Sequence, residues 1–353
     1  MVGQRFVTLL SDHPYFSISA LAASPKSAGK KYSEAIKGRW KMPAPVPEAV
    51  RDMEVFDASD VKKLSGLCDF VFSAFEMPKK EDVKNLEEAY AKAETPVVSN
   101  TSACRSCPDV PMLIAEINSS HLAVIETQKK RLGTKRGFVA VKPNCSIQSY
   151  VPMLTPLLGY GLAEVAVSTY QAISGAGKSF EDWPEMIDNV IPHIGGEEEK
   201  SEKEPMKIWG SVNGGIIEYA KLPAITSQCI RVPATDGHLA AVYIKFKNSA
   251  AKPSKEEIIR LWEEFSGEPQ KLNLPSAPKQ FIRYFGEDDR PQTKLDRDFE
   301  NGMAISAGRL REDGSGIFDY KFVGLSHNTL RGAAGGGVLS AELLHKKGFI
   351  GKK

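Results

Sequence analysis

The stretch KPNCSIQSY, Lys142–Tyr150, joins two apolar segments and places a single cysteine at the junction. The preceding segment, Gly137–Val141, is short and apolar, which predicts a buried strand. The following segment, Ile147–Leu158, predicts a helix that is interrupted or kinked by Pro152 and Pro156. The cysteine therefore sits in a turn between a strand and a helix, the unit from which α/β folds are built.

Cys145 occupies the start of this predicted helix. Unpaired backbone N–H groups and the positive end of the helix dipole favour a thiolate there, and the thiolate is the form that attacks carbonyl carbon. A free cysteine is often no more than a small buried hydrophobe. The polar neighbours Asn144 and Ser146 argue against burial here, so Cys145 is a candidate nucleophile.

The chain before Cys145 alternates short apolar strands with helices, the pattern of a parallel sheet covered on both faces. Between two of the strands, Glu81–Glu94 has the charge and the alanine and leucine content of a surface helix. We therefore expect an α/β fold with a Rossmann-like dinucleotide-binding domain. Its predicted strands are Ser17–Ala23, Asp69–Ala74, Thr95–Ser99 and Gly137–Val141.

After about residue 150 the predicted strands lengthen and alternate in polarity, as in Ile225–Pro233 and His238–Lys247. This pattern predicts a second, α+β domain on a mixed or antiparallel sheet, and 353 residues suffice for two domains with separate cores. Near the end, Gly332–Gly337 leads into a predicted helix, Val338–His345, that would return to the first domain. The expected division is a first domain of residues 1–145, completed by the terminal helical segment 329–353, and a second domain of residues 146–328.

The N-terminal segment, Met1–Leu10, has a helical pattern with no strand ahead of it. A dinucleotide-binding fold normally begins with a strand, a glycine-rich turn and a helix. We therefore expect the first domain to be truncated at its N-terminus, without its first strand and most of its glycine-rich turn.

Charge and cysteine content exclude several classes of function. The 46 basic and 44 acidic residues leave a formal net charge of +2 with no long basic block, so no nucleic-acid partner is expected. No stretch approaches the length of a membrane span, so no membrane association is expected. Five scattered cysteines do not form the pattern of a disulfide framework and fit a reducing compartment, which predicts a cytoplasmic protein.

A cysteine nucleophile needs a proton partner, and the segment from Arg231 to His238 offers the clearest one. A strand, a turn and a second strand would present both side chains to one site. Arginine holds a carboxylate through two parallel hydrogen bonds, while histidine takes the thiol proton and moves protons during turnover. This pairing predicts an acidic substrate, although a turn-capping histidine and an arginine in a surface ion pair explain the spacing equally well.

Two other clusters support weaker predictions. Cys104 and Cys107 have the spacing of a redox or zinc motif, but a single pair without a second pair or a nearby histidine is weak support for a metal. The acidic run Glu197–Glu199 is interpreted as a solvated helix face. We therefore expect no bound metal.

Several short motifs share their order and spacing with one known family: Val2–Phe6, Pro143–Ser146, Gly195–Lys200, Arg231–His238 and Asn328–Ala334. Together they resemble aspartate-semialdehyde dehydrogenase in its fungal and archaeal-like branch. The resemblance runs nearly end to end, and the motifs are specific as a set.

The resemblance implies NADP-dependent reductive dephosphorylation of L-4-aspartyl phosphate to L-aspartate 4-semialdehyde, in the pathway to lysine, methionine and threonine. Cys145 matches the nucleophile, which displaces phosphate to give a thioester that NADPH reduces. His238 matches the acid/base residue, and Gln171 matches a residue that orients the acyl group. The family assembles through its second domain, so residues 146–328 are expected to form a catalytic and dimerisation domain of a homodimer or homotetramer.

The resemblance also implies a set of substrate contacts. Arg231 matches the residue that grips the substrate carboxylate, and Glu204 matches the contact to the substrate amino group. Arg105 and Lys207 would hold the phosphate, since converging cations suit a group that carries nearly two negative charges. Asn144 is also expected at the substrate.

The expected cofactor site begins where the predicted strand Ser17–Ala23 ends. Ser24, Lys26 and Ser27 follow that strand, where this fold meets the adenine ribose, and hydroxyls with a lysine suit a 2′-phosphate. NADP is therefore expected rather than NAD, although a solvated basic loop is a competing interpretation. Further expected cofactor contacts, taken from glycine-rich turns, a strand end and the family match, are Gly3, Ser73, Ser174, Gly175, Gly177 and Asn328.

Other functions stay open at this point. The expected loss at the N-terminus would fit a truncated chain with poor NADP affinity or a non-catalytic paralogue, as well as a working enzyme whose chain starts further upstream. A reductase of coenzyme A thioesters, such as malonyl-CoA reductase, would share the cysteine, histidine and NADP chemistry. A cysteine hydrolase would need only Cys145 and His238. Arg105 and Lys207 favour an acyl phosphate, and the retained catalytic set favours a working enzyme.

Overall fold

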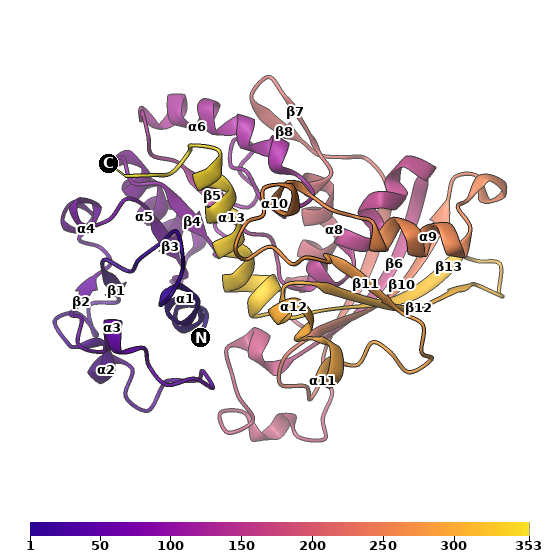
Figure 1. The fold of residues 1–353 in the computed structure, drawn as a ribbon, viewed down its shortest axis with the longest axis horizontal. Coiled ribbons are helices and arrows are strands. Elements are labelled where there is room, and N and C mark those ends of the chain that lie inside the picture. The colour runs from indigo at the N-terminus through magenta and orange to yellow at the C-terminus, as the bar shows by residue number, and fades with distance from the viewer. Residues whose placement is uncertain (353) are drawn as a thin grey trace.

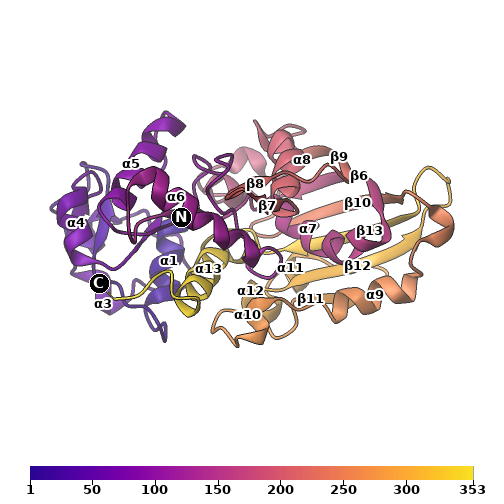
Figure 2. The ribbon, with the colours of Figure 1, turned by 90° about the horizontal axis from the view of Figure 1, so that it is seen from above.

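The computed structural model describes residues 1–352, which form two halves lying side by side (Figure 1, Figure 2). The first half alternates short strands with helices, as predicted. Its strands are β1 (Leu21–Ala23), β2 (Val55–Asp57), β3 (Val71–Ser73), β4 (Val97–Ser99) and β5 (Val139–Val141), and its helices are α1 (Val2–Leu10), α2 (Tyr32–Ala35), α3 (Glu48–Arg51), α4 (Val61–Leu67), α5 (Lys80–Lys92) and α6 (Ile125–Leu132).

The strands of the first half pair in parallel, but they form two separate sheets. β1 pairs with β2, and β3, β4 and β5 pair in that order. Each predicted strand is present but shorter than the apolar pattern suggested. The difference arises because an apolar run reports burial, whereas a strand also needs a hydrogen-bonded neighbour.

The two ends of the chain pack together on the first half. Phe6 of α1 stacks on Phe72 of β3, with ring centroids 4.5 Å apart. The terminal helix α13 (Gly335–Lys346) contributes Val338 to the same cluster. Leu339 and Leu343 of α13 join a second cluster that includes side chains of β4 and β5. The terminal helix therefore belongs spatially to the first half, although the whole second half separates it from β5 in the sequence (Figure 1).

The second half is built on a six-stranded sheet in the order β11-β12-β13-β10-β6-β9. β6 pairs parallel with β9 and antiparallel with β10, so the predicted mixed sheet is confirmed. The predicted strands Ile225–Pro233 and His238–Lys247 correspond to β9 and β10. The strands are β6 (Leu162–Gln171), β9 (Ala224–Arg231), β10 (His238–Phe246), β11 (Ile282–Phe285), β12 (Ile305–Glu312) and β13 (Tyr320–Ser326), and β7 (Ser211–Asn213) and β8 (Ile216–Glu218) form a separate hairpin.

Alternating apolar residues of the large sheet pack against helices to form the main core. Ala240, Val242 and Ile244 of β10 are buried at every second position, and Trp262 packs edge-on against Phe322 of β13. The helices of this half are α7 (Val151–Leu154), α8 (Glu197–Ile208), α9 (Lys255–Glu263), α10 (Glu268–Lys271), α11 (Thr293–Asp296) and α12 (Phe299–Gly302). None of the helices within residues 1–352 has both the length and the apolar composition needed to cross a bilayer.

The segment after Cys145 is broken into three short pieces, as its prolines predicted. A 3-10 turn (Ser146–Ser149) is followed by α7 and by a second 3-10 helix (Thr155–Tyr160). Pro152 and Pro156 each lie in the first turn of a piece, where a missing N–H group costs least.

Candidate active site

The candidate nucleophile lies where strands of both halves end. Cys145 follows β5, His238 begins β10, and Gln171 and Arg231 are paired residues at the ends of β6 and β9. Cys145 Sγ lies 3.4 Å from His238 Nε2. The cysteine and histidine that are 93 positions apart in the sequence are therefore in contact.

His238 is fully buried and is held in one orientation by the backbone. Its Nδ1 accepts a hydrogen bond of 3.1 Å from the backbone N–H of Ala172. We assign the neutral ring a proton on Nε2 from this contact, because Nδ1 is occupied as an acceptor. Burial, reinforced by the positive charge of Arg231, lowers the pKa of His238 to about 3. The ring is therefore neutral near pH 7 and presents an N–H donor to Cys145 Sγ.

The environment of Cys145 does not favour the thiolate in this structure, contrary to the sequence-based expectation. Burial and the charge of Glu197 raise the pKa of its thiol to about 11, although Lys142, Arg105 and Arg231 act in the opposite direction. The helix that follows is a single 3-10 turn of 4 residues, so its dipole has little effect. Thiolate formation therefore requires a further change in the local charge.

Cys145 is half-buried, so it is not sealed in the core, but its polar neighbours are not the cause of its exposure. Asn144 and Ser146 are both buried, and their polar groups find hydrogen-bond partners within the protein. Asn144 Oδ1 accepts hydrogen bonds from the backbone N–H and the hydroxyl of Ser146, at 2.7 and 2.6 Å. This Asx-type turn fixes the backbone on both sides of Cys145.

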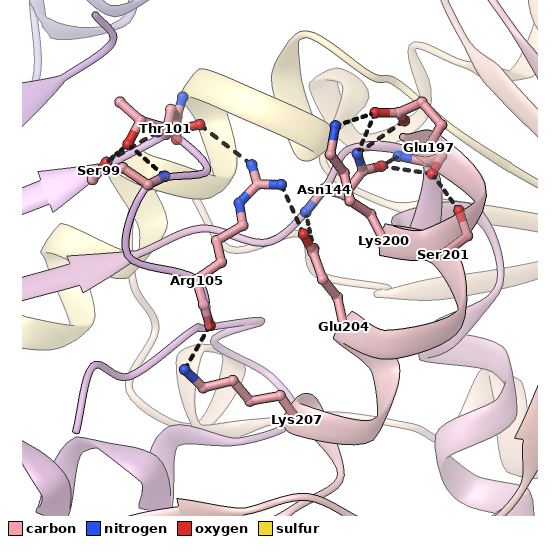
Figure 3. Close-up of polar contacts among 12 residues, drawn as sticks. Ser99, Thr101, Arg105, Asn144, Glu197, Lys200, Ser201, Glu204 and Lys207 are labelled. Carbon is pink, nitrogen blue, oxygen red and sulfur yellow. Dashed lines mark hydrogen bonds and ion pairs between the residues drawn. The ribbon is translucent and has the colours of Figure 1, made fainter. Parts of the chain in front are cut away.

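Glu204 of α8 holds two of the predicted substrate contacts in place (Figure 3). Its carboxylate accepts a hydrogen bond of 2.9 Å from Arg105 Nη1 and one of 2.6 Å from the backbone N–H of Asn144. Lys207, one turn further along α8, is fully buried. Its Nζ donates to the carbonyl oxygens of Arg105 and Cys107, at 2.7 and 2.6 Å. Lys207 therefore fixes the loop that carries Arg105.

Glu197 was missed as a site residue, because the acidic run was interpreted as a solvated face. That interpretation is wrong for Glu197, whose side chain is 12% exposed, against 69% for Glu199. The Glu197 carboxylate accepts hydrogen bonds from Asn144 Nδ2, Gln171 Nε2 and Lys200 Nζ, the last at 2.7 Å. Burial works against its charged form, but the Lys200 ion pair and the Asn144 hydrogen bond hold its pKa below the usual range.

The signal for Glu197 in the sequence is the glycine pair directly before it. Gly196 adopts a left-handed conformation, with φ of 71°, and α8 begins at the next residue. The first carboxylate of the run therefore turns back toward the strand ends, while the later ones follow the outer face of the helix.

Arg231 and the loop Ser174–Gly177 are packed closely together. Arg231 Nη1 donates to the carbonyl oxygen of Ala172 at 2.6 Å. An added Cβ at Gly175 would lie 2.9 Å from Arg231 Nη1 and 3.1 Å from His238 Cε1, so only glycine fits at this position. Asn328 supports the same loop, because its Nδ2 donates to Ser174 Oγ at 2.8 Å.

A cavity of about 560 Å³ opens beside Cys145. Of the residues predicted for the site, its lining includes Arg105, Asn144, Cys145, Ser174, Gly175 and Asn328. The cavity also contacts Glu197, Lys200, Lys142 and the segment Ala74–Pro78 that follows β3. It is large enough for a substrate together with part of a cofactor.

Other predicted cofactor contacts lie outside this lining. Ser24 and Lys26 are exposed and Ser27 is half-buried, on the turn after β1. Gly3 lies in the first turn of α1, and Gly177 ends the 3-10 turn after β6. Ser73 is buried, and its hydroxyl donates to Glu87 Oε1 at 2.6 Å.

Comparison with known proteins agrees with this arrangement. Residues 1–125 match the family model described as semialdehyde dehydrogenase, NAD binding domain, and residues 154–331 match semialdehyde dehydrogenase, dimerisation domain. Aspartate-semialdehyde dehydrogenases of Schizosaccharomyces pombe and Archaeoglobus fulgidus are 43% and 41% identical to this chain, over 99% of its length and 96% of theirs. The solved structure of aspartate semialdehyde dehydrogenase with NADP from Candida albicans is 38% identical, with a TM-score of 0.87 over 98% of this chain and 96% of that one.

These matches confirm the expected fold class and the expected resemblance to fungal and archaeal relatives. The chain belongs to the aspartate-semialdehyde dehydrogenase family.

Proposed function

We propose that this chain catalyses the NADP-dependent reductive dephosphorylation of L-4-aspartyl phosphate to L-aspartate 4-semialdehyde, a step in lysine, methionine and threonine biosynthesis. The observation that carries the proposal is the 3.4 Å contact between Cys145 Sγ and His238 Nε2, beside a cavity that Arg105 also lines. Membership of the family indicates the reaction, and this contact supports Cys145 as the nucleophile and His238 as its partner.

Cys145 acts as the nucleophile. Its sulfur attacks the acyl carbon of the substrate and loses its proton, and the bond from that carbon to the phosphate oxygen breaks. The phosphate leaves with the electron pair of that bond and takes up the proton. The product on the enzyme is a thioester. His238 presents its Nε2–H to the negative charge that develops on sulfur or on the acyl oxygen, where a donor in a buried site is most effective.

The substrate is held by groups of opposite charge. Arg231 receives the carboxylate, since its guanidinium is already fixed on the carbonyl of Ala172. Glu204 receives the amino group, and Arg105 the phosphate. Gln171 orients the acyl group, and its Nε2 donates a hydrogen bond to the Glu197 carboxylate.

The residues near Cys145 fit a dinucleotide. Ser174, Gly175 and Asn328 line the cavity next to the nucleophile, where a nicotinamide ring would have to lie. The turn after β1 exposes Ser24 and Lys26, which suits the 2′-phosphate that distinguishes NADP from NAD. Bound NADPH supplies the hydride that reduces the acyl carbon.

The second half supports an inference about quaternary structure. The match to a dimerisation domain supports an oligomer, and a homodimer or homotetramer in the cytoplasm is the form that we expect. Ile187 and Val190 leave 62% and 56% of their surface exposed, which suits burial by a second copy.

The test is phosphate-dependent reduction of NADP with aspartate semialdehyde as substrate. Cys145→Ser is expected to abolish turnover, and His238→Asn to lower kcat by about 10²- to 10⁴-fold. Cys68→Ser is the matched control, because Cys68 lies at the end of α4 and is expected to leave the rate unchanged.

Malonyl-CoA is the competing substrate in the same assay. Turnover of malonyl-CoA, with none of the semialdehyde in the presence of phosphate, would assign the chain to the coenzyme A thioester reductases instead. Release of product without NADP would assign it to the hydrolases.

A further inference from the structure

Cys104 and Cys107 form a pair of thiols that the proposed reaction does not use. They lie after β4, at the two ends of the short turn that carries Arg105. The backbone N–H of Cys107 donates to the carbonyl oxygen of Cys104 at 3.1 Å, which closes this turn. A closed turn brings its first and fourth Cα atoms to within about 7 Å, and a disulfide needs about 4.4–6.8 Å. The backbone therefore already holds the two cysteines at a separation that suits a disulfide.

The two side chains interact through a hydrogen bond between their sulfur atoms. The S–H of Cys104 donates to Cys107, and this bond, together with the positive charges of Lys84 and Lys207, lowers the pKa of Cys107 to about 7. The same bond and burial raise the pKa of Cys104. Cys107 therefore ionises first, beside a thiol that keeps its proton. A low-pKa thiolate next to a second, resolving thiol is the arrangement found in redox-sensing cysteine pairs.

The two thiols differ in their access to solvent. Cys107 is half-buried between the exposed residues Ser106 and Pro108, so a small oxidant can approach its sulfur. Cys104 is fully buried in the main core and meets an oxidant only after Cys107 has reacted. Burial raises the pKa of the Cys145 thiol to about 11, so near pH 7 Cys107 carries the larger fraction of thiolate. The pair is therefore a separate reactive site beside the proposed nucleophile.

The turn between the two cysteines is connected to the active-site cavity. Arg105 lines the cavity, and its Nη1 donates to Glu204 at 2.9 Å. Lys207 Nζ donates to the carbonyl oxygens of Arg105 and Cys107, at 2.7 and 2.6 Å, so these two residues are held as one unit (Figure 3). A disulfide would draw the sulfur atoms of Cys104 and Cys107 together to about 2.05 Å. Because the turn is anchored on Lys207, this movement acts directly on the position of Arg105.

The other side of the pair is connected to the cavity through a buried carboxyl group. Glu87 accepts hydrogen bonds from Ser99 Oγ at 2.6 Å and from Thr101 Oγ1 at 3.1 Å, and Thr101 lines the cavity. Burial raises the pKa of Glu87, while the neighbouring hydroxyls and the Cys104 thiol act in the opposite direction. A disulfide removes the Cys104 proton and with it this contribution. Oxidation therefore also changes the support of the segment that follows β4.

We propose that Cys104 and Cys107 form a reversible disulfide when the protein meets a peroxide, and that this modification lowers activity by displacing Arg105. The Cys107 thiolate attacks one peroxide oxygen and the O–O bond breaks. The departing oxygen takes up the proton that the thiol released and leaves as water, so Cys107 becomes a sulfenic acid. The Cys104 sulfur then attacks the Cys107 sulfur, the S–O bond breaks, and the hydroxyl leaves with the Cys104 proton as a second water. A dithiol reductant reverses the change by exchange.

The test treats the reduced, full-length protein with hydrogen peroxide, blocks the remaining thiols with N-ethylmaleimide and digests the unfolded chain with trypsin. Trypsin cuts after Arg105, so the reduced protein gives Cys104 and Cys107 on separate peptides that each carry the blocking group. The oxidised protein is expected to give the two peptides joined and unblocked, and dithiothreitol before blocking is expected to separate them. In parallel, kcat/KM for phosphate-dependent reduction of NADP is expected to fall about 10-fold or more and to recover with dithiothreitol.

Variants separate this pair from the proposed nucleophile, which peroxide also oxidises. Cys107→Ser is expected to keep the rate of the untreated protein within about twofold and to lose the reversible inactivation, so any loss that remains reports Cys145. Cys104→Ser is the second variant if Cys107→Ser does not fold, since a hydroxyl keeps a donor at this position. Cys68→Ser is the matched control, because Cys68 is also half-buried but lies at the end of α4. It is expected to retain both the joined peptides and the inactivation.

Absence of the joined peptides from the oxidised wild type would overturn the inference. Joined peptides with an unchanged kcat/KM would overturn the link to Arg105, and equal losses of activity in the wild type and Cys107→Ser would assign the inactivation to Cys145 instead. Failure of the proposed function gives a different result, in which the untreated wild type shows no phosphate-dependent turnover. In that case the joined peptides and their separation by dithiothreitol still decide whether the disulfide forms.

Discussion

Gly332→Ala tests whether the nucleophile is held in place by the chain segment packed against it. Gly332 lies in the π-helical turn Leu330–Ala334, and an added Cβ would lie 2.8 Å from Cys145 Cβ and 3.3 Å from its Cα. Ordinary contact begins at 3.4 Å, so Cys145 or the turn must move by about 0.6 Å. Both segments are buried, so the overpacking is expected to cost about 1–3 kcal/mol of stability.

The displacement acts on the reaction because Cys145 Sγ lies only 3.4 Å from His238 Nε2. A misplacement approaching 1 Å is expected to lower kcat by about 10- to 100-fold. Steady-state kinetics and the rate of Cys145 alkylation measure the effect on the site, and urea denaturation at fixed protein concentration measures the stability.

The same substitution elsewhere in the chain provides the control. Gly66 lies in α4 and is exposed, and an added Cβ would meet no atom of residues 1–352 within 4 Å outside its chain neighbours and the backbone of its own helix. Gly66→Ala is therefore expected to stabilise the protein by about 0.5–1 kcal/mol and to leave kcat unchanged. If Gly332→Ala kept kcat within about twofold of the wild type, the tight packing against Cys145 would not constrain the nucleophile, and this reasoning would be refuted.

Three further perturbations follow from the buried charges. Glu197→Gln removes a negative charge that raises the pKa of Cys145. The limb of the pH profile of kcat/KM that reports thiolate formation is therefore expected to move to lower pH. A shift of this limb to higher pH would contradict the assigned electrostatics. Glu116→Gln leaves the fully buried guanidinium of Arg331 without its carboxylate partner. Urea titrations are expected to show a free energy of unfolding lower by about 3–5 kcal/mol. A loss below about 1 kcal/mol would contradict the stabilising role of this ion pair. Burial lowers the pKa of His238 to about 3 in the folded protein. In the unfolded chain the same histidine is protonated below about pH 6.5, so the free energy of unfolding falls as the pH is lowered. Between pH 7 and pH 5 this group accounts for a loss of about 2 kcal/mol, and His238→Asn should remove that part of the pH dependence of unfolding.

The sequence by itself determined the class of fold and indicated the proposed catalytic pair. Apolar segments with turn residues between them report burial locally, so the strands around Cys145 and the long strand that begins at His238 could be located without knowledge of the fold. The breaks at Pro152 and Pro156 were also predictable, because proline removes a backbone donor wherever it stands. Family motifs added the chemistry, since they record which side chains act together.

The electrostatics of the site depend on tertiary structure. The pKa of Cys145 is set by burial and by Glu197, which is 52 positions away in the sequence, and a local rule about helix dipoles predicted the wrong direction. Lys207 is buried and Glu197 half-buried in α8, a helix whose charged composition suggests a solvated face. The packing of α8 fixes which side of the helix faces the strand ends. The amino-acid composition of α8 does not reveal that side.

Only the folded chain brings Lys142, Asn100 and Arg105 to one cavity. Within residues 1–352 it leaves Lys142 Nζ, the Asn100 side-chain amide and Arg105 Nε without hydrogen-bond partners. Sequence reports the charge of a lysine, but whether that charge is solvated, paired with a carbonyl or held ready for a ligand depends on neighbours that other segments supply. Local patterns therefore determined which elements form and which residues are candidates for catalysis. The relative placement of distant segments decided how those residues are charged and which groups surround them.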